Sequence, residues 1–375
     1  MDSSPVHRVH RVLSDLAAGC PTVLIGSPGT DPDGYLLAAA EKATTTTVAF
    51  MVRYSSGFLC AGLTGTHCDR IGLPPMVGAV PGLSGSNHTV SVDAVGSGTG
   101  ISASDRADTL RQLADPHSTA TEFTRPGHVI PVRAVADGVL GHRGPAEAGT
   151  DLAGLAGLHR VVAFAALVSD KDPAAIAGAA ECREFARAHH LNWVTVDDVA
   201  AYRRVSEDHV RTCFTERRGT PFGVLCATGF HSTATGSNYV AYRIDQPDGR
   251  GDPMVHVYRE RDFAPHAHPA DTDLQTLFAH LSASGSDVII VERRVNSLDL
   301  GYARNHDGRI ADIAQIIRDM GLIGAELLVP VPGMAETLAA FGIATSSHDS
   351  APVISPPVRG GPLGTASEVR RGIVQ

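Results

Sequence analysis

The chain has 375 residues, of which 43% are hydrophobic and 19% are charged. This length and composition predict a water-soluble globular protein with room for two domains and two hydrophobic cores. The formal net charge is -9. It argues against nucleic acid or an anionic membrane surface as a partner, because both carry negative charge themselves.

The cysteine spacing and the apolar runs indicate the cellular compartment in which the protein is expected. No two of the six cysteines have C-x-x-C spacing, so neither a zinc knuckle nor a redox pair is indicated. Charged residues interrupt the N-terminal segment, and no apolar run reaches the length of a membrane span, so neither a signal peptide nor a transmembrane helix is expected. Free thiols in a reducing cytoplasm are the simplest interpretation.

Helices and strands are expected to alternate up to about residue 204. Val6, Val9, Val12 and Leu16 recur at helical spacing, which predicts an amphipathic first helix at 5–18. The other expected helices are 46–54, 103–114, 148–156 and 174–189. The expected strands are 22–25, 59–63, 89–92, 161–168 and 193–196. This mixed order predicts a layered α+β domain.

A second domain is expected after a polar segment. Residues 206–219 are charged and polar, which favours a linker, so we expect a first domain at 1–204 and a linker at 205–219. The second domain is then expected at 220–348. Its expected strands are 223–227, 239–244, 254–258, 288–291 and 327–329, and its helices 270–281, 310–320 and 334–341. Residues 349–375 are rich in Pro, Gly and Ser, which predicts a flexible tail.

Three segments carry a resemblance to a known family. They read GFLCAGLTGTHCDRIGLPPMV (57–77), TVSVDAVGSGTGISASDRA (89–107) and FTRPGHVIPVRA (123–134). They resemble 3,4-dihydroxy-2-butanone 4-phosphate synthase of riboflavin biosynthesis, in the bifunctional form fused to GTP cyclohydrolase II. The resemblance implies a synthase fold, and magnesium-dependent conversion of ribulose 5-phosphate with release of formate. It also implies a small phosphorylated ligand and a homodimer with its site at the two-fold interface.

The resemblance also assigns site residues. It implies catalytic roles for His128, Cys60, Asp31 and Asp33, with Asp31 as a weak magnesium ligand in place of a family glutamate. It implies substrate binding by Thr99, Asp105, Arg106, His88, His142 and Arg143.

Structural roles remain open for several of these residues. Ser102 and Asp105 have the spacing of a helix cap. Arg125 is a candidate to pair with Asp105 or Glu122. Cys60 on a strand is also typical of a small buried hydrophobe, and His128 of a structural hydrogen bond.

Other positions depart from the family pattern. Tyr35 replaces a substrate-binding aspartate, and Ala166 replaces a glutamate needed for proton transfer. Pro145 stands where the family has a metal-ligating histidine, and Ala146 where it has a threonine. Proline offers no ligand atom, and alanine cannot transfer protons. His142 and Arg143 are the nearest residues that would compensate.

The second domain resembles a degenerate GTP cyclohydrolase II. Residues 255–274 contain no cysteine where the family has its zinc cysteines, so we expect no zinc and no cyclohydrolase activity. His266 and His268 are the alternative metal ligands, since their H-x-H spacing permits chelation.

Three functions remain open. The first is a divergent homologue with repurposed chemistry on a sugar phosphate or a related small molecule, lyase-like if it is an enzyme. The second is a non-catalytic structural or regulatory homologue. The third is a weak synthase that acts on ribulose 5-phosphate.

Overall fold

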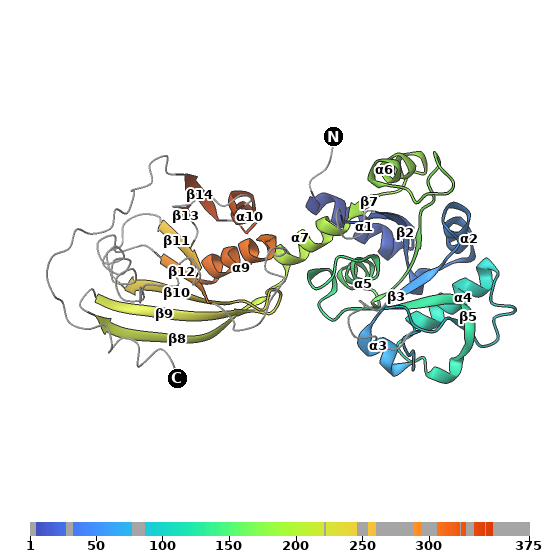
Figure 1. Ribbon diagram of the computed structural model, residues 1–375, viewed down its shortest axis with the longest axis horizontal. Helices are drawn as coiled ribbons and strands as arrows, with labels where there is room; N and C mark the ends of the chain where they lie inside the picture. Colours follow the sequence, from blue (N-terminus) through green and yellow to red (C-terminus); the bar gives the residue numbers. More distant parts are fainter. Residues whose placement is uncertain are drawn as a thin grey trace. The chain divides into compact units, whose positions relative to one another are not determined.

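The computed structural model describes residues 5–27, 33–76, 87–220, 223–245, 254–259, 288–293, 306–322, 324–327, 334–341 and 343–347. The chain divides into two compact units, Met1–Ser206 and Glu207–Gln375 (Figure 1). Each combines a sheet with helices, so the α+β prediction is confirmed. Asp31, the histidine pair His266 and His268, the expected helix at 270–281 and the tail at 349–375 lie outside the described residues.

The first unit is built on a seven-stranded mixed sheet in the order β4-β5-β3-β6-β2-β1-β7. The strands are β1 (Thr22–Ile25), β2 (Gly34–Ala39), β3 (Cys60–Thr64), β4 (Val92–Ala94), β5 (Phe123–Ala134), β6 (Val161–Ala166) and β7 (Trp193–Thr195). Strand β6 runs antiparallel to both of its neighbours, whereas β3 pairs with β5 and β1 with β7 in parallel. The apolar sequence of β6 fits this central place, since both of its faces are covered.

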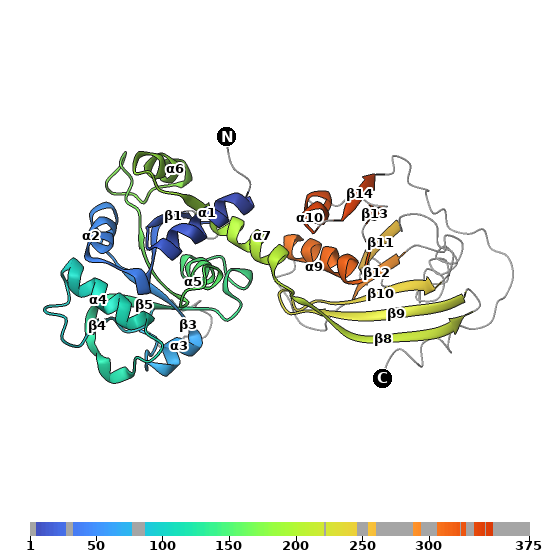
Figure 2. The same cartoon turned by 180° about the vertical axis from the view of Figure 1, so that it is seen from behind.

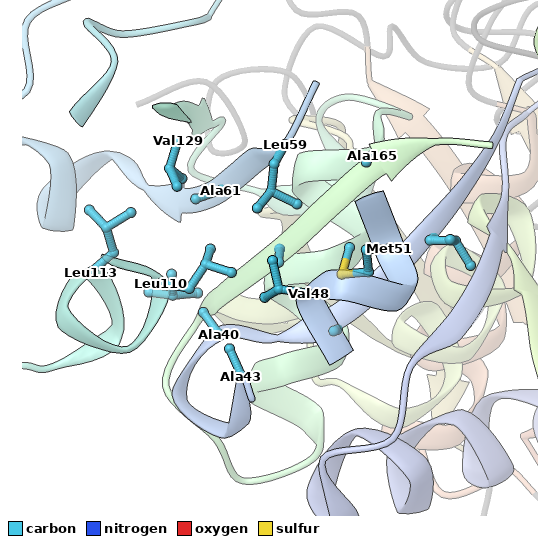
Figure 3. Packing of buried hydrophobic residues seen from close by; sticks show 14 of the residues in the cluster. Ala40, Ala43, Val48, Met51, Leu59, Ala61, Leu110, Leu113, Val129 and Ala165 are labelled. Carbon is cyan, nitrogen blue, oxygen red and sulfur yellow. The ribbon is translucent and has the colours of Figure 1, made fainter. Parts of the chain in front are cut away.

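Helices cover both faces of this sheet (Figures 1 and 2). They are α1 (Pro5–Ala18), α2 (Thr45–Tyr54), α3 (Gly65–Arg70), α4 (Ala103–Ala114), α5 (Pro145–Leu155), α6 (Ala179–Ala188) and α7 (Val196–Ser206). Short 3₁₀ turns lie at 40–42, 120–122 and 138–140. Two buried clusters separate the faces: one joins the sheet to α2, α4 and α6, the other to α1, α5 and α7. Figure 3 shows Val48 and Met51 of α2 in the first cluster, together with Leu110 and Leu113 of α4.

Side-chain caps fix the starts of α2 and α4. Thr44 Oγ1 accepts from Thr47 N at 3.1 Å, and Ser102 Oγ accepts from Asp105 N at 3.0 Å. Each cap satisfies a backbone donor that the helix itself leaves without a partner. The predicted cap at Ser102 is therefore confirmed, and so are the predicted bounds of α1 and α4.

The second unit contains another seven-stranded sheet, in the order β14-β13-β11-β12-β10-β9-β8. The strands are β8 (Val210–Thr220), β9 (Gly223–Ser232), β10 (Asn238–Asp245), β11 (Met254–Arg259), β12 (Val288–Arg293), β13 (Gly324–Leu327) and β14 (Ala344–Ser347). The described helices are α9 (His306–Asp319) and α10 (Met334–Ala340). Apolar residues of both helices, such as Ile313 and Leu338, form one core with Tyr239, Val288 and Ile290 of the sheet.

The expected linker at 205–219 is wrong over most of its length. Residues 210–220 form strand β8, which pairs with β9 on both sides of a register shift at residue 213. The strand lies at the edge of the sheet, and charged side chains are common on edge strands because they discourage further pairing. Its Glu216, Arg217 and Arg218 therefore read as a solvated linker in the sequence.

Candidate functional site

His128 and Asp93 form a hydrogen-bonded pair at the β4 side of the sheet. The register between β4 and β5 shifts between Val92 and Asp93, so β5 bulges over residues 125–128. Gly127 permits this bulge, since a Cβ there would lie 2.0 Å from the Val92 carbonyl carbon. Asp93 Oδ1 accepts from His128 N at 2.8 Å, and Asp93 Oδ2 lies 2.7 Å from His128 Nδ1.

This pair leaves Nε2 of the imidazole ring able to accept a proton. An ionised carboxylate only accepts hydrogen bonds, so Nδ1 carries the proton and donates a hydrogen bond to Asp93. In the neutral ring Nε2 then has a lone pair. The His128 side chain is 41% exposed and that of Asp93 only 11%, so a ligand can reach the ring while the carboxylate behind it is shielded. The geometry suits a general base held in one orientation.

A glycine-rich turn encloses the other edge of the pair. Gly100 has φ +79°, and a Cβ there would lie 2.0 Å from Asp93 Oδ2 and 2.8 Å from His128 Nδ1. Asp105 Oδ2 accepts from Gly100 N at 3.0 Å and holds the turn against α4. Thr99 is exposed in this turn. The structure thus gathers Thr99, Asp105 and His128 around one turn, and it gives Asp105 a bracing contact.

Cys60 is buried at the start of β3. The strand register places it between Ile130 of β5 and Phe164 of β6, and it is 4% exposed. Burial raises the pKa of its thiol to about 12, so the reactive thiolate is strongly disfavoured. This placement fits the alternative role of Cys60 as a small buried hydrophobe.

Tyr35 and Ala166 stand directly opposite each other. They are register partners at adjoining ends of β2 and β6, one strand position beyond Leu36 and Ala165. The Tyr35 ring meets Phe164 edge-on, with centroids 6.0 Å apart. The two positions at which the resemblance expects carboxylates therefore carry a phenol and a methyl group, side by side.

The loop before α5 carries His142 and Arg143. His142 Nδ1 lies 3.1 Å from Oε2 of the buried Glu147, whose Oε1 accepts from Val135 N. Arg143 donates to Asp197, at the start of α7. Asp197 also accepts from Ser27 Oγ at 2.9 Å. Both expected substrate-binding side chains therefore take part in contacts within the protein.

Two other expected site residues lie apart from this loop. Asp33 directly precedes β2, and its backbone oxygen accepts a hydrogen bond from Gly26 N at 2.9 Å. Burial is the main cause of the raised pKa of Cys182, and the charge of the Asp33 carboxylate adds to it. His88 lies beside β5 and forms an isolated β-bridge with Val132. The centre of its ring lies 6.2 Å from the centre of the Phe58 ring. Partial burial lowers the pKa of His88.

The expected Arg125 ion pair is wrong. Arg125 donates to four backbone carbonyl oxygens, those of Ile71, Gly72, Ala120 and Phe123. Glu122 instead accepts from Thr119 N in a capping box. Arg125 still braces its loop, but through the backbone.

The described residues include only part of the expected magnesium site. Within the ranges that the structure describes, no group of three His, Cys, Asp or Glu side chains is placed to hold a metal ion. Pro145 is the first residue of α5 and has no ligand atom. Magnesium requires several oxygen ligands in near-octahedral geometry, and Asp31, the expected ligand, lies outside the described ranges.

Sequence reasoning missed three acidic residues. Asp93 orients His128, Glu147 contacts His142, and Asp197 binds Arg143. Asp93 had one visible signal, a carboxylate inside a short apolar strand. The partnerships themselves join residues far apart in the chain and depend on the fold.

Comparisons with known proteins agree with this architecture. Residues 10–202 match the family described as 3,4-dihydroxy-2-butanone 4-phosphate synthase. Riboflavin biosynthesis protein RibBA of Rhodococcus jostii is 45% identical over 257 residues, which are 67% of this chain and 62% of that protein. RibBA of Mycolicibacterium gilvum is 41% identical over 310 residues, 80% of this chain and 71% of that protein. The match thus spans somewhat less than two thirds of the Rhodococcus relative.

Solved structures extend the likeness to both units. RibBX of A. baumannii, a two-domain 3,4-dihydroxy-2-butanone 4-phosphate synthase, superposes with a TM-score of 0.70 at 26% identity and covers 91% of this chain and all of that one. A synthase structure in complex with two magnesium ions is 39% identical, with a TM-score of 0.50, and covers 53% of this chain and 97% of that one. Within the described residues, no helix is long and apolar enough to cross a membrane. The chain is a homologue of riboflavin-biosynthesis proteins and belongs to the 3,4-dihydroxy-2-butanone 4-phosphate synthase family.

Proposed function

We propose that this chain acts on a sugar phosphate or a related small molecule, with His128 as its general base and without the magnesium-dependent rearrangement of its family. The observation that carries the proposal is the register pairing of Tyr35 with Ala166. Tyr35 cannot bind the substrate as the aspartate of the family does, and Ala166 cannot transfer a proton as the glutamate does. The His128–Asp93 pair remains intact in the same unit.

His128 supplies a proton-transfer step that needs no metal. Its Nε2 would take the proton from a carbon next to the substrate carbonyl, while Asp93 stabilises the imidazolium that forms. The resulting enediolate is reprotonated by the same ring. This assigns the chain to proton abstraction next to a carbonyl.

The family reaction is the second candidate. Relatives that are 41% and 45% identical are named riboflavin biosynthesis proteins, and the general-base pair would serve that reaction as well. In this case ribulose 5-phosphate would be converted to 3,4-dihydroxy-2-butanone 4-phosphate and formate. A homodimer is part of both proposals, and sedimentation at micromolar concentration tests it.

One experiment separates these functions. The purified chain is incubated with ribulose 5-phosphate in deuterated buffer, with and without magnesium, while NMR follows formate and deuterium incorporation next to the carbonyl. We expect deuterium incorporation in both buffers and little formate. The His128→Gln variant should lose at least about 100-fold of the exchange rate, the usual effect of removing a general base.

The matched control is His117→Gln, which changes an exposed histidine away from the pair and should leave exchange unchanged. Formate release at the rate of a RibBA protein assayed alongside would establish the second candidate and overturn the first. Absence of both exchange and formate would reject both and favour a non-catalytic homologue.

A further inference from the structure

A hollow of about 570 Å³ lies between α2 and α4 in the first unit. Its lining includes Thr46, Ala49, Phe50, Arg53, Ala103 and Arg106. Figure 3 shows Val48 and Met51 of α2 packed inward with Leu110 of α4, so the hollow lies on the outer side of these helices. Cys60 and Tyr35 belong to the opposite face of the sheet, with α1, α5 and α7. The hollow is therefore separate from the face that carries these two residues.

Arg106 is the unusual residue of this hollow. It is 9% exposed, and its Nε has no hydrogen-bond partner among the residues that the structure describes. Its NH1 donates to the Gly57 carbonyl at 3.4 Å, which is long for such a bond. A guanidinium has five donors, and a buried one normally has acceptors for them. Burial lowers the pKa of Arg106, and the nearby Asp93 opposes this effect.

A second cation borders the same space. Arg53, in the last turn of α2, is exposed, and its guanidinium carbon lies 5.7 Å from the centre of the Tyr54 ring. Arg53 and Arg106 thus place two guanidinium groups on one hollow, one buried and one facing solvent. Paired arginines favour phosphate or carboxylate groups, because the planar fork donates two parallel hydrogen bonds to two oxygens.

The remaining lining is mainly apolar. Phe50, Ala49 and Ala103 offer ring and methyl surface next to the two arginines, and Thr46 adds a hydroxyl group. Small-molecule sites commonly combine an apolar lining with a few converging polar groups. A bare inorganic ion would leave this apolar surface unused.

We infer that the hollow between α2 and α4 is a binding site for a small organic anion, with a phosphate or carboxylate head held by Arg53 and Arg106 and an apolar body packed against Phe50. Arg106 lies near Asp93, so the site borders the His128–Asp93 pair, but the test below measures binding alone and does not require the proposed proton transfer. The anionic head is common to phosphate esters and carboxylic acids, and the experiment separates the two.

Calorimetry with three probes tests the inference: phenyl phosphate, benzoate and inorganic phosphate, each added to the full chain. We expect saturable binding of phenyl phosphate or benzoate, and at least about tenfold weaker binding of inorganic phosphate because it lacks the apolar body. The tighter of the two aromatic probes identifies the head group. Arg53→Gln should weaken binding about tenfold, the order expected for one charge-assisted hydrogen bond.

Two further variants keep the test sharp. Ala49→Trp fills the hollow from an exposed helix position and should abolish binding without unfolding the chain. Arg187→Gln changes an exposed arginine on α6 that does not line the hollow and should bind like the parent chain. The inference is overturned if none of the probes binds at about 10 mM. It is equally overturned if binding survives both Arg53→Gln and Ala49→Trp unchanged.

Discussion

Replacing Tyr239 by phenylalanine should destabilise the second unit by about 2 kcal/mol. Tyr239 is 1% exposed, and its hydroxyl donates to Asp312 Oδ2 at 2.8 Å. Asp312 is fully buried and also accepts from Ser232 and Thr235, while His209 Nε2 lies 3.2 Å from its Oδ1. The carboxylate therefore depends on hydroxyl donors that replace water.

The magnitude follows from the charge of the acceptor. A hydrogen bond to a charged group contributes about 1.5–3 kcal/mol, more than a neutral pair. Phenylalanine keeps the ring in the core and removes only the hydroxyl group, so no large cavity forms. Because Asp312 keeps its other partners, the loss should fall in the lower half of that range.

Urea unfolding measures this effect with two probes. The single tryptophan, Trp193, belongs to the first unit, so its fluorescence follows that unit, whereas circular dichroism follows both. A loss of about 2 kcal/mol should lower the urea midpoint of the second unit by about 1 M.

A double-mutant cycle supplies the decisive control. In the Asp312→Asn background the Tyr239→Phe substitution should cost clearly less, because the charged acceptor is already gone. An unchanged midpoint in the single variant would refute the reasoning. An equal cost in both backgrounds would refute it too, since the hydroxyl would then act without Asp312.

Four other outcomes are expected. Alkylation followed by mass spectrometry should label the exposed Cys20 and Cys213 first. Cys60, Cys68 and Cys182 should stay protected in the folded chain, because burial raises their pKa values to about 11 or 12. Burial, followed by the charge of Arg70, lowers the pKa of His67 to about 4. The folded state therefore prefers neutral His67, so the contribution of His67 to the stability of the first unit is complete above pH 6.5 and is lost as pH falls towards 4. The His67→Gln variant should lose less stability over this pH range, as measured by unfolding followed through Trp193 fluorescence. Ser102→Ala should lower the stability of the first unit by about 1 kcal/mol in urea unfolding, because α4 loses its cap. Elemental analysis should find no stoichiometric zinc, since residues 255–274 lack cysteine.

Helix α4 and strand β1 were predicted from the sequence with their exact bounds, whereas helices α3 and α7 were not expected. Helix α4 shows both a cap and an apolar periodicity, so its bounds were predicted correctly. Strand β5 was missed because Pro126, Gly127 and Pro131 are typical of turns. The fold places the first two in a bulge and Pro131 in a parallel pair with Ala61. Such a position becomes visible only when the neighbouring strand is known.

Some residues of the candidate site can be identified from the sequence, and others only from the fold. His128 was identifiable from the motif around it, whereas its partner Asp93 lies 35 residues earlier and across a register shift. Arg106 is expected to bind substrate, and it lines the hollow between α2 and α4, near Asp93. The sequence shows which residue types are present, but only the packing of α2 against α4 determines which side chains line the hollow.

The glycine at position 100 has a consequence for chemical probes of His128. Because its backbone closes over Nδ1 and Asp93 accepts a hydrogen bond from the Nδ1–H group, an alkylating or acylating reagent can approach the ring only at Nε2. Modification should therefore be regioselective and give a single isomer of the adduct. A small inhibitor with an electrophile would therefore need to place that group beside Nε2.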